Sequence, residues 1–244
     1  MRPTPSESEV LAALKTFAEL VGEATQFWYS AAALNEAAIV DPKLFQALQT
    51  GAGFWNTVRG GLEMHAIVAV GRILGERGEN ARNIDWFREV ILNGSAHLSP
   101  SAHEARKCNA ASGRESEGFL PRDIDRLRFL VKKYKGVYQD QFRDIRNSIA
   151  AHSGGLTAAE REVIYGKTRI RDFERALRFL NGLHDAVWQM YYNGRRFGLR
   201  SSPASVRRLA RTDISTLDRA KNIEFTVIEA RKALAIYLQG ASSQ

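Results

Sequence analysis

The 244-residue chain contains one cysteine, six prolines and no long hydrophobic run. The lone Cys108 excludes a disulfide scaffold and a cysteine-based zinc site, and it is typical of a reducing compartment. The first ten residues lack the apolar stretch of a signal peptide, so we expect a cytoplasmic location. The most apolar segment, Leu62 to Leu74, is interrupted by Glu63, His65 and Arg72. It falls short of the roughly 20 apolar residues of a membrane span, so we expect no membrane partner.

Motifs of several enzyme classes are absent as well. The five histidines show no spacing that suits zinc ligands. No glycine-rich loop precedes a lysine in the manner of a phosphate-binding loop, and no G-x-S-x-G elbow is present. We therefore expect neither a metal nor an organic cofactor.

The composition is that of a globular protein, with 44% hydrophobic and 25% charged residues. The net charge of +8 is distributed unevenly: residues 1–120 carry −3 and residues 121–244 carry +11. A basic half of this kind favours a polyanionic partner, most often a nucleic acid. Solvated helix faces would give the same imbalance, and charge alone leaves both interpretations open.

Hydrophobic periodicity predicts helices almost everywhere and no strand. Long amphipathic helices are expected from Val10 to Ala31 after an N-cap at Ser6 or Ser8, from Lys43 to Gly75, from Pro121 to His152, from Thr168 to Asn193, and from Leu217 to Tyr237. Short helices are expected after Asn83, near Ser101 to Ala110 and after Thr157, with a loop-rich excursion over 94–118. The fold class is therefore all-α, as one domain over 1–244 with a core at about 8–195 and a C-terminal extension at about 203–240. Glycines inside the second long helix, Gly60, Gly61 and Gly71, predict close approach by a neighbouring element.

One segment, FRDIRNSIAAHSGG, combines residue types that suit acid–base chemistry. It places Arg146 and Asn147 four residues before His152, in the pattern R-N-x4-H. Two other histidines follow an arginine at the same distance, but glycine or phenylalanine stands in place of the asparagine there. The full pattern is expected by chance only about 0.02 times in a chain of this composition.

Helix geometry adds a physical argument. In an unbroken α-helix, His152 lies seven residues after Ile145 and continues its apolar stripe, so it faces a neighbour or a groove. Arg146 precedes His152 by about 9 Å of helix rise, and its side chain is long enough to reach the same groove. A helix C-terminus also favours the imidazolium form. The alternative is a histidine that caps the last carbonyls beside a solvated arginine, and spacing does not decide between the two.

The motif segment resembles the HEPN superfamily, helical domains whose signature is arginine, a polar residue and then histidine near the end of a late helix. The order of elements over roughly residues 10–195 is similar too. The segment FWNTVRGGLEMHAIVAVGRILGE resembles the second helix of the AbiU-type abortive-infection branch, whose pattern is an apolar run, arginine, two apolar residues and an acid. Residues Arg72 to Leu74 match that pattern, whereas Gly75 stands in place of the acid and Glu76 follows it.

The resemblance implies a HEPN-type helical bundle that cleaves RNA without a metal, as a toxin or phage-defence effector. His152 would act as general base or acid on the ribose 2′-hydroxyl and the leaving 5′-oxygen, Arg146 would bind the phosphate, and Asn147 would orient the site. Such domains typically dimerise, so that two motifs share one cleft; the implied partners are RNA, a second copy and an antitoxin protein. The alternative is a non-catalytic HEPN-like module that binds RNA, a nucleotide or a protein.

The remaining basic residues and histidines have weaker interpretations. Arg143, Arg195 and Arg196 are candidate RNA contacts, together with Arg200, Arg207 and Arg208; the alternative for the last five is a flexible basic linker. His65 and His184 continue apolar stripes and are expected in the core. His97 and His103 fall in the polar excursion and are expected on the surface.

Overall fold

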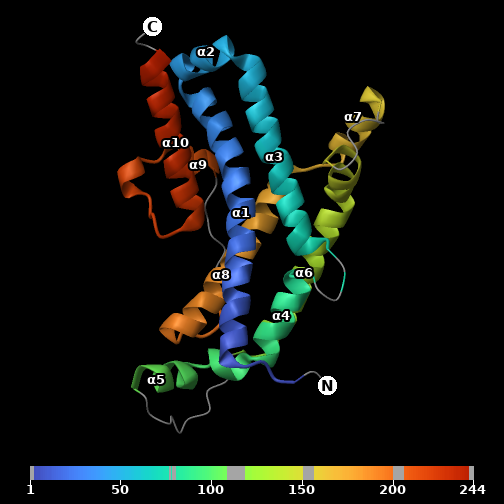
Figure 1. Ribbon diagram of the computed structural model, residues 1–244, viewed down its shortest axis with the longest axis vertical. Helices are drawn as coiled ribbons and strands as arrows, with labels where there is room; N and C mark the ends of the chain where they lie inside the picture. Colours follow the sequence, from blue (N-terminus) through green and yellow to red (C-terminus); the bar gives the residue numbers. More distant parts are fainter. Residues whose placement is uncertain are drawn as a thin grey trace. The chain divides into compact units, whose positions relative to one another are not determined.

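The computed structural model describes residues 3–76, 78, 81–108, 119–150, 157–199 and 206–241. Every regular element within these ranges is a helix (Figure 1), so the predicted all-α fold is confirmed there. The chain divides into two compact units. We call Met1–Val21 with Val70–Ser202 the motif unit, and Gly22–Ala69 with Pro203–Gln244 the hairpin unit.

The first helix, α1 (Glu7–Val40), begins as its sequence predicts. The Ser6 hydroxyl accepts a hydrogen bond from the backbone N–H of Glu9 at 3.3 Å, and the Glu9 carboxylate accepts one from the Ser6 N–H at 2.7 Å. This reciprocal arrangement satisfies two backbone donors that the helix leaves unpaired. The stripe residues of its first half, Val10, Leu14, Phe17 and Val21, are buried in the motif unit.

Helices α2 (Pro42–Thr50) and α3 (Ala52–Leu74) follow, and the prediction of one helix from Lys43 to Gly75 is wrong at Gly51. Gly51 leaves the helical conformation and ends α2 with its N–H on the Leu48 carbonyl at 3.2 Å. The predicted break before Pro42 is confirmed, because Asp41 caps α2 through the backbone N–H groups of Lys43 and Leu44. Figure 1 shows α2 between the ends of α1 and α3.

The hairpin unit is completed by α9 (Val206–Arg211), the 3-10 turn η3 (Ile214–Thr216) and α10 (Asn222–Ala241). Leu34, Leu44, Leu48 and Leu234 form its buried cluster, where α10 packs on α1 and α2. The last helix begins five residues later than predicted, so Leu217 and Ala220 lie outside it. The Asp218 carboxylate explains this start, because it accepts the Ala220 N–H at 2.9 Å and holds a turn there.

The motif unit contains α4 (Ile84–Asn93), the 3-10 turn η1 (Ser95–Leu98), α5 (Pro100–Cys108), α6 (Pro121–Gln141), the π-helical turn η2 (Ile145–Ala150), α7 (Ala158–Gly166) and α8 (Ile170–Asn193). The predicted caps at Asn83 and Thr157 and the short helix within 94–118 are confirmed, whereas residues 109–118 lie outside the described part. The prediction that Thr168 opens α8 is wrong: its hydroxyl donates to the Tyr165 carbonyl after the end of α7, and α8 begins at Ile170.

The motif helix is also shorter than predicted. Its α-helical part ends at Gln141, and the backbone from Ile145 to Ala150 forms a π-helical turn. Bonds from i to i+5 widen the turn, so a seven-residue spacing no longer returns to the same face. The spacing from Ile145 to His152 therefore no longer supports a position for His152 on the apolar stripe. His152 itself lies outside the described residues.

None of the described helices combines the length and the hydropathy required to cross a membrane.

Candidate functional site

Three buried side chains anchor the segment that leads into the motif. Tyr138, Phe142 and Ile145 continue the inner stripe of α6 at spacings of four and three residues, and each is nearly inaccessible to solvent. The Phe142 ring packs edge-to-face on Phe173 of α8, with 5.0 Å between ring centroids. Arg146 follows directly, so the position of its backbone is fixed by the core even though its own side chain is 29% exposed.

Gly71, in the last turn of α3, makes room for the motif arginine. A Cβ at this position would lie 2.9 Å from Cδ of Arg146 and would overlap the hydroxyl of Tyr138. One turn later, a Cβ at Gly75 would lie 2.7 Å from Cε1 of the same tyrosine. The two glycines thus form a notch that holds the tyrosine ring and the arginine stem against the α3 backbone. Here the prediction drawn from mid-helix glycines is confirmed.

The same prediction is wrong at Gly60 and Gly61, where no described atom lies within 4 Å of an added Cβ. These two positions are exposed on the surface of α3. An isolated glycine in a helix has the same sequence signal whether a neighbour approaches it or not.

Tyr138 gives the notch its electrostatic character. Burial raises the pKa of its phenol to about 12, and the nearby Arg146 guanidinium opposes that shift. The hydroxyl has no partner among the described residues that satisfies hydrogen-bond distance and angle, so its relation to Arg146 is one of proximity. At neutral pH the notch therefore presents a neutral phenol and a fixed cation side by side.

Glu76 supplies the negative charge of the site. Its carboxylate lies 3.6 Å from the Arg146 guanidinium. The chain turns here because α3 ends at Leu74, and the N–H groups of Gly75 and Glu76 both donate to the Gly71 carbonyl, at 2.8 and 3.0 Å. The Asn83 side chain donates to the Glu76 carbonyl at 2.8 Å and fixes the turn further.

Sequence reasoning did not assign a partner to Arg146. The signal was the acid that follows the Arg72–Leu74 pattern, displaced by one residue to Glu76. The shift of the acid from position 75 to position 76 has little effect because α3 has already ended. The turn after Leu74 brings the Glu76 carboxylate to Arg146.

The other predicted site residues are placed as follows. Asn147 and Arg143 are both exposed on the surface beside Arg146. Asp144 lies between them in sequence and pairs with Lys167, 3.5 Å away. Arg195 and Arg196 are exposed where the chain leaves α8, and none of the described contacts joins them to Arg146. Arg200, like His152, is outside the described residues.

The remaining histidines correct two of the sequence interpretations. His65 is exposed rather than in the core, with Nδ1 2.8 Å from the Gly61 carbonyl oxygen of its own helix. His103 is buried rather than on the surface, and it packs against Gly194, the left-handed residue that ends α8. His97 is half-buried, 3.2 Å from the Pro5 carbonyl oxygen. His184 is mostly buried as expected, and burial lowers its pKa.

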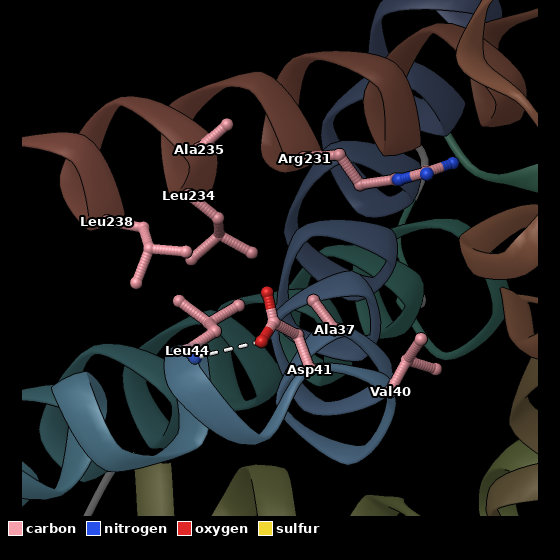
Figure 2. A pocket seen from close by; sticks show the side chains of 8 residues that line it. All are labelled: Ala37, Val40, Asp41, Leu44, Arg231, Leu234, Ala235 and Leu238. Atoms are coloured by element: carbon pink, nitrogen blue, oxygen red, sulfur yellow. Dashed lines mark hydrogen bonds between the residues drawn. The ribbon is translucent and has the colours of Figure 1, made fainter.

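A separate pocket of about 270 Å³ lies within the hairpin unit (Figure 2). Its apolar wall includes Leu44, Leu234 and Leu238. Its two charged groups are occupied in holding the fold: the Asp41 carboxylate caps α2, and the Arg231 guanidinium donates to the carbonyls of Leu209 and Thr212. The pocket therefore offers no free acid, base or phosphate ligand.

The described residues include no cluster of three or more histidine, cysteine or acidic side chains that would hold a metal ion. The family model HEPN_AbiU2, described as AbiU2, matches residues 9–208. The chain belongs to the AbiU2 family of HEPN domains. The match spans both the Gly71 notch and the R-N-x4-H motif, so the resemblance inferred from these two segments is confirmed at the level of the family. No curated protein and no solved structure matches the chain.

Proposed function

We propose that this AbiU2-family protein is a metal-independent endoribonuclease that acts in abortive infection. The observation that carries the proposal is the placement of Arg146. Its backbone is held by buried neighbours and its stem lies in the Gly71 notch, while its side chain remains 29% exposed and the next residue, Asn147, is exposed. A guanidinium presents five N–H donors in a planar fork that matches a phosphate.

In the proposed reaction, His152 accepts the proton of a ribose 2′-hydroxyl, and the 2′-oxygen attacks the adjacent phosphorus. The bond from phosphorus to the 5′-oxygen breaks, and that oxygen receives a proton from a general acid. Arg146 stabilises the negative charge that gathers on the phosphoryl oxygens, and Asn147 donates a hydrogen bond that orients the same group. The products carry a 2′,3′-cyclic phosphate and a 5′-hydroxyl. DNA, which lacks the 2′-hydroxyl, is not cleaved.

The reaction requires both a base and an acid, whereas the motif has one histidine. We propose that two copies pair about a two-fold axis and that each supplies His152 to a shared cleft, one as base and one as acid. His65 and His184 are unsuited to that second role, because neither lies in a setting like that of the motif: one is bound to its own helix and the other is mostly buried.

The test is RNA cleavage by the purified protein in EDTA, with wild type beside His152→Ala. We expect cleavage by wild type only, with cyclic phosphate ends on the products. Cleavage that requires Mg²⁺ and leaves 5′-phosphates would contradict the mechanism. A wild-type protein that binds RNA and cleaves none in EDTA or in Mg²⁺ would favour the non-catalytic alternative.

A further inference from the structure

Helix α6 carries a second stripe opposite the buried one. Arg122, Arg126, Phe129, Lys133 and Asp140 follow one another at helical spacing, and all are exposed. Gly136 continues the stripe, and Arg143 extends it to the motif. We call these seven residues, with the adjacent Lys132, the α6 outer stripe. It ends three residues before Arg146, so it leads along the helix to the proposed site.

The charge of the outer stripe is largely uncompensated. Within the described part of the chain, its five cations (Arg122, Arg126, Lys132, Lys133 and Arg143) form no ion pair, and Asp140 is the one acid of the stripe. Other basic residues nearby are paired: Arg128 with Asp125, Lys135 with Asp85, and Lys167 with Asp144. Lys133 has one further contact, with Nζ 5.5 Å from the centroid of the Tyr134 ring. A run of cations without ion pairs on one helix face is suited to a polyanion whose charges repeat.

Phe129 distinguishes this face from an ordinary solvated surface. Its ring is 65% exposed and contacts no other ring among the described residues. It stands between Arg126, three residues earlier, and Lys133, four residues later. It is also the one strongly exposed large apolar side chain of α6, so the face is unlike the contiguous apolar patch of a protein or membrane interface.

An exposed aromatic ring flanked by cations is the arrangement that binds single-stranded nucleic acid: the ring stacks on a base while the cations contact the backbone phosphates. In a duplex the bases stack on one another and their faces are not available to the ring. We propose that the α6 outer stripe binds single-stranded RNA, with one base stacked on Phe129, and guides the strand toward Arg146. The proposal rests on the proposed function for its substrate class, and it deepens that function by assigning the binding surface and the single-stranded preference.

Phe129 and Arg146 are 17 residues apart, and the α-helix that separates them ends at Gln141, which is roughly 18 Å of helix rise beyond Phe129. A bound strand would therefore span several nucleotides between the stacked base and the scissile phosphate. Short oligonucleotides that cannot reach both points should be cleaved poorly even when they contain the cleavage site.

The test is the affinity for a fluorescent 12-nucleotide single-stranded RNA, measured by anisotropy in the His152→Ala protein so that the RNA stays intact. Phe129→Ala should weaken binding about 5- to 150-fold, the equivalent of about 1–3 kcal/mol for one stacked base. Phe54→Ala is the matched control, because that ring, also 65% exposed, lies in the hairpin unit. It should leave the affinity unchanged.

The charges are tested separately. Affinity falls as salt rises, and each phosphate contact on a single strand adds about 0.7 to the steepness of log affinity against log salt. Lys132→Ala combined with Lys133→Ala should therefore make this dependence less steep by up to about 1.4. Lys43→Ala combined with Lys221→Ala, two exposed lysines of the hairpin unit, is the control and should leave the slope unchanged.

Equal affinities of the Phe129→Ala and Phe54→Ala proteins would overturn the proposal, as would equal losses for single-stranded and duplex RNA. A Phe129→Ala protein with a lower molecular mass in light scattering and an unchanged RNA affinity would show a protein interface instead. Because binding is measured without cleavage, loss of the catalytic proposal would leave this result standing, and the reverse is also true.

Discussion

Arg59 and Arg146 each precede a histidine by six residues, but the two arginines have different surroundings. Arg59 lies inside a regular stretch of α3, with Nε 3.9 Å from Glu63 and its guanidinium donating to Asn35 at 3.2 Å. The histidine that follows it, His65, is exposed beside its own helix. Arg146 instead lies in a π-helical turn, where it packs into a notch on another helix.

The comparison shows that the spacing of arginine and histidine does not by itself make a site. Around Arg59 the nearby glycines are open to solvent, and the ion pair with Glu63 is the surface type that contributes little to stability. Around Arg146, side-chain atoms of Tyr138 and Arg146 itself occupy the space beside Gly71, and the backbone is π-helical rather than α-helical. The carboxylate of Glu76, which lies in the turn after α3, pairs with the guanidinium. Breaks of this kind in helices are common at functional sites.

The largest effect should come from the two arginines themselves. We expect Arg146→Ala to reduce RNA cleavage at least about 100-fold, the usual loss when a group that stabilises transition-state charge is removed. Arg59→Ala should stay within about twofold of wild type, because Arg59 is a half-buried residue of the hairpin unit with no described contact to the motif. Single-turnover rates on the same RNA measure both. Similar losses in the two proteins would remove the distinction between the regions.

Substitutions at Gly71 and Gly61 should change the free energy of unfolding in opposite directions. Gly71→Ala should lower the free energy of unfolding by about 1–3 kcal/mol, because its Cβ overlaps Tyr138 and crowds Arg146. Gly61→Ala should raise it by about 0.5–1 kcal/mol, since alanine is favoured over glycine in an open helix position. Urea unfolding of the two variants provides the values. A Gly71→Ala protein as stable as Gly61→Ala would mean that the notch is not tightly filled.

Tyr138 gives the notch a dependence on alkaline pH. The buried phenol has a pKa of about 12, above its ordinary value near 10, so the unfolded chain releases this proton first. Below pH 10 the shift has no effect; between pH 10 and 12 it lowers the free energy of unfolding by about 1.4 kcal/mol per pH unit. Tyr138→Phe should remove this part of the alkaline loss, measured as the change in stability between pH 9 and 11. Tyr165→Phe, at an exposed position, is the control and should unfold like wild type.

The smallest expected effect is the change in RNA affinity when Glu76 or Glu63, the carboxylates beside the two arginines, is neutralised. Glu76→Gln removes a negative charge near the phosphate position, so RNA binding should tighten by up to about fivefold at low salt and return to the wild-type value at high salt. Glu63→Gln, beside Arg59, is matched in chemistry and should change the affinity less. Weaker binding by the Glu76→Gln protein would indicate that the carboxylate positions Arg146 rather than competing with RNA.

Much of the helical layout follows from the sequence because burial has a period that the residues display. The stripes at Val10–Val21 and at Phe173–Tyr191 are buried as predicted, and so is the stripe at Leu127–Ile145 except at Tyr134, which is half-buried. The helix caps at Ser6, Asn83 and Thr157 could also be predicted, because each depends on neighbouring residues only. In each cap the side chain accepts a hydrogen bond from the backbone N–H three residues later. The periodicity and the capping residues within each segment are therefore enough to predict most of its helix.

The predictions that were wrong or incomplete concern features that depend on residues distant in the sequence. Periodicity did not show the interruption at Gly51 or the π-helical turn at Ile145, because the apolar pattern continues through both. It placed the exposed His65 in the core, since a stripe does not say whether another helix covers it. The polar composition of residues 94–118 placed His103 on the surface, whereas its side chain is buried against the end of α8. The pairing of Glu76 with Arg146 required the end of α3 to be known, and that end is set by a turn on Gly71.

The most direct measurement uses a DNA oligonucleotide that contains a single ribonucleotide, incubated with the protein in EDTA. The account predicts cleavage at that one position, with a 2′,3′-cyclic phosphate on the 5′ fragment, because the attacking group is the ribose 2′-hydroxyl. Both Arg146→Ala and His152→Ala should leave the oligonucleotide intact. Cleavage of the matching all-DNA strand, or equal cleavage by wild type and the Arg146→Ala protein, would contradict the account.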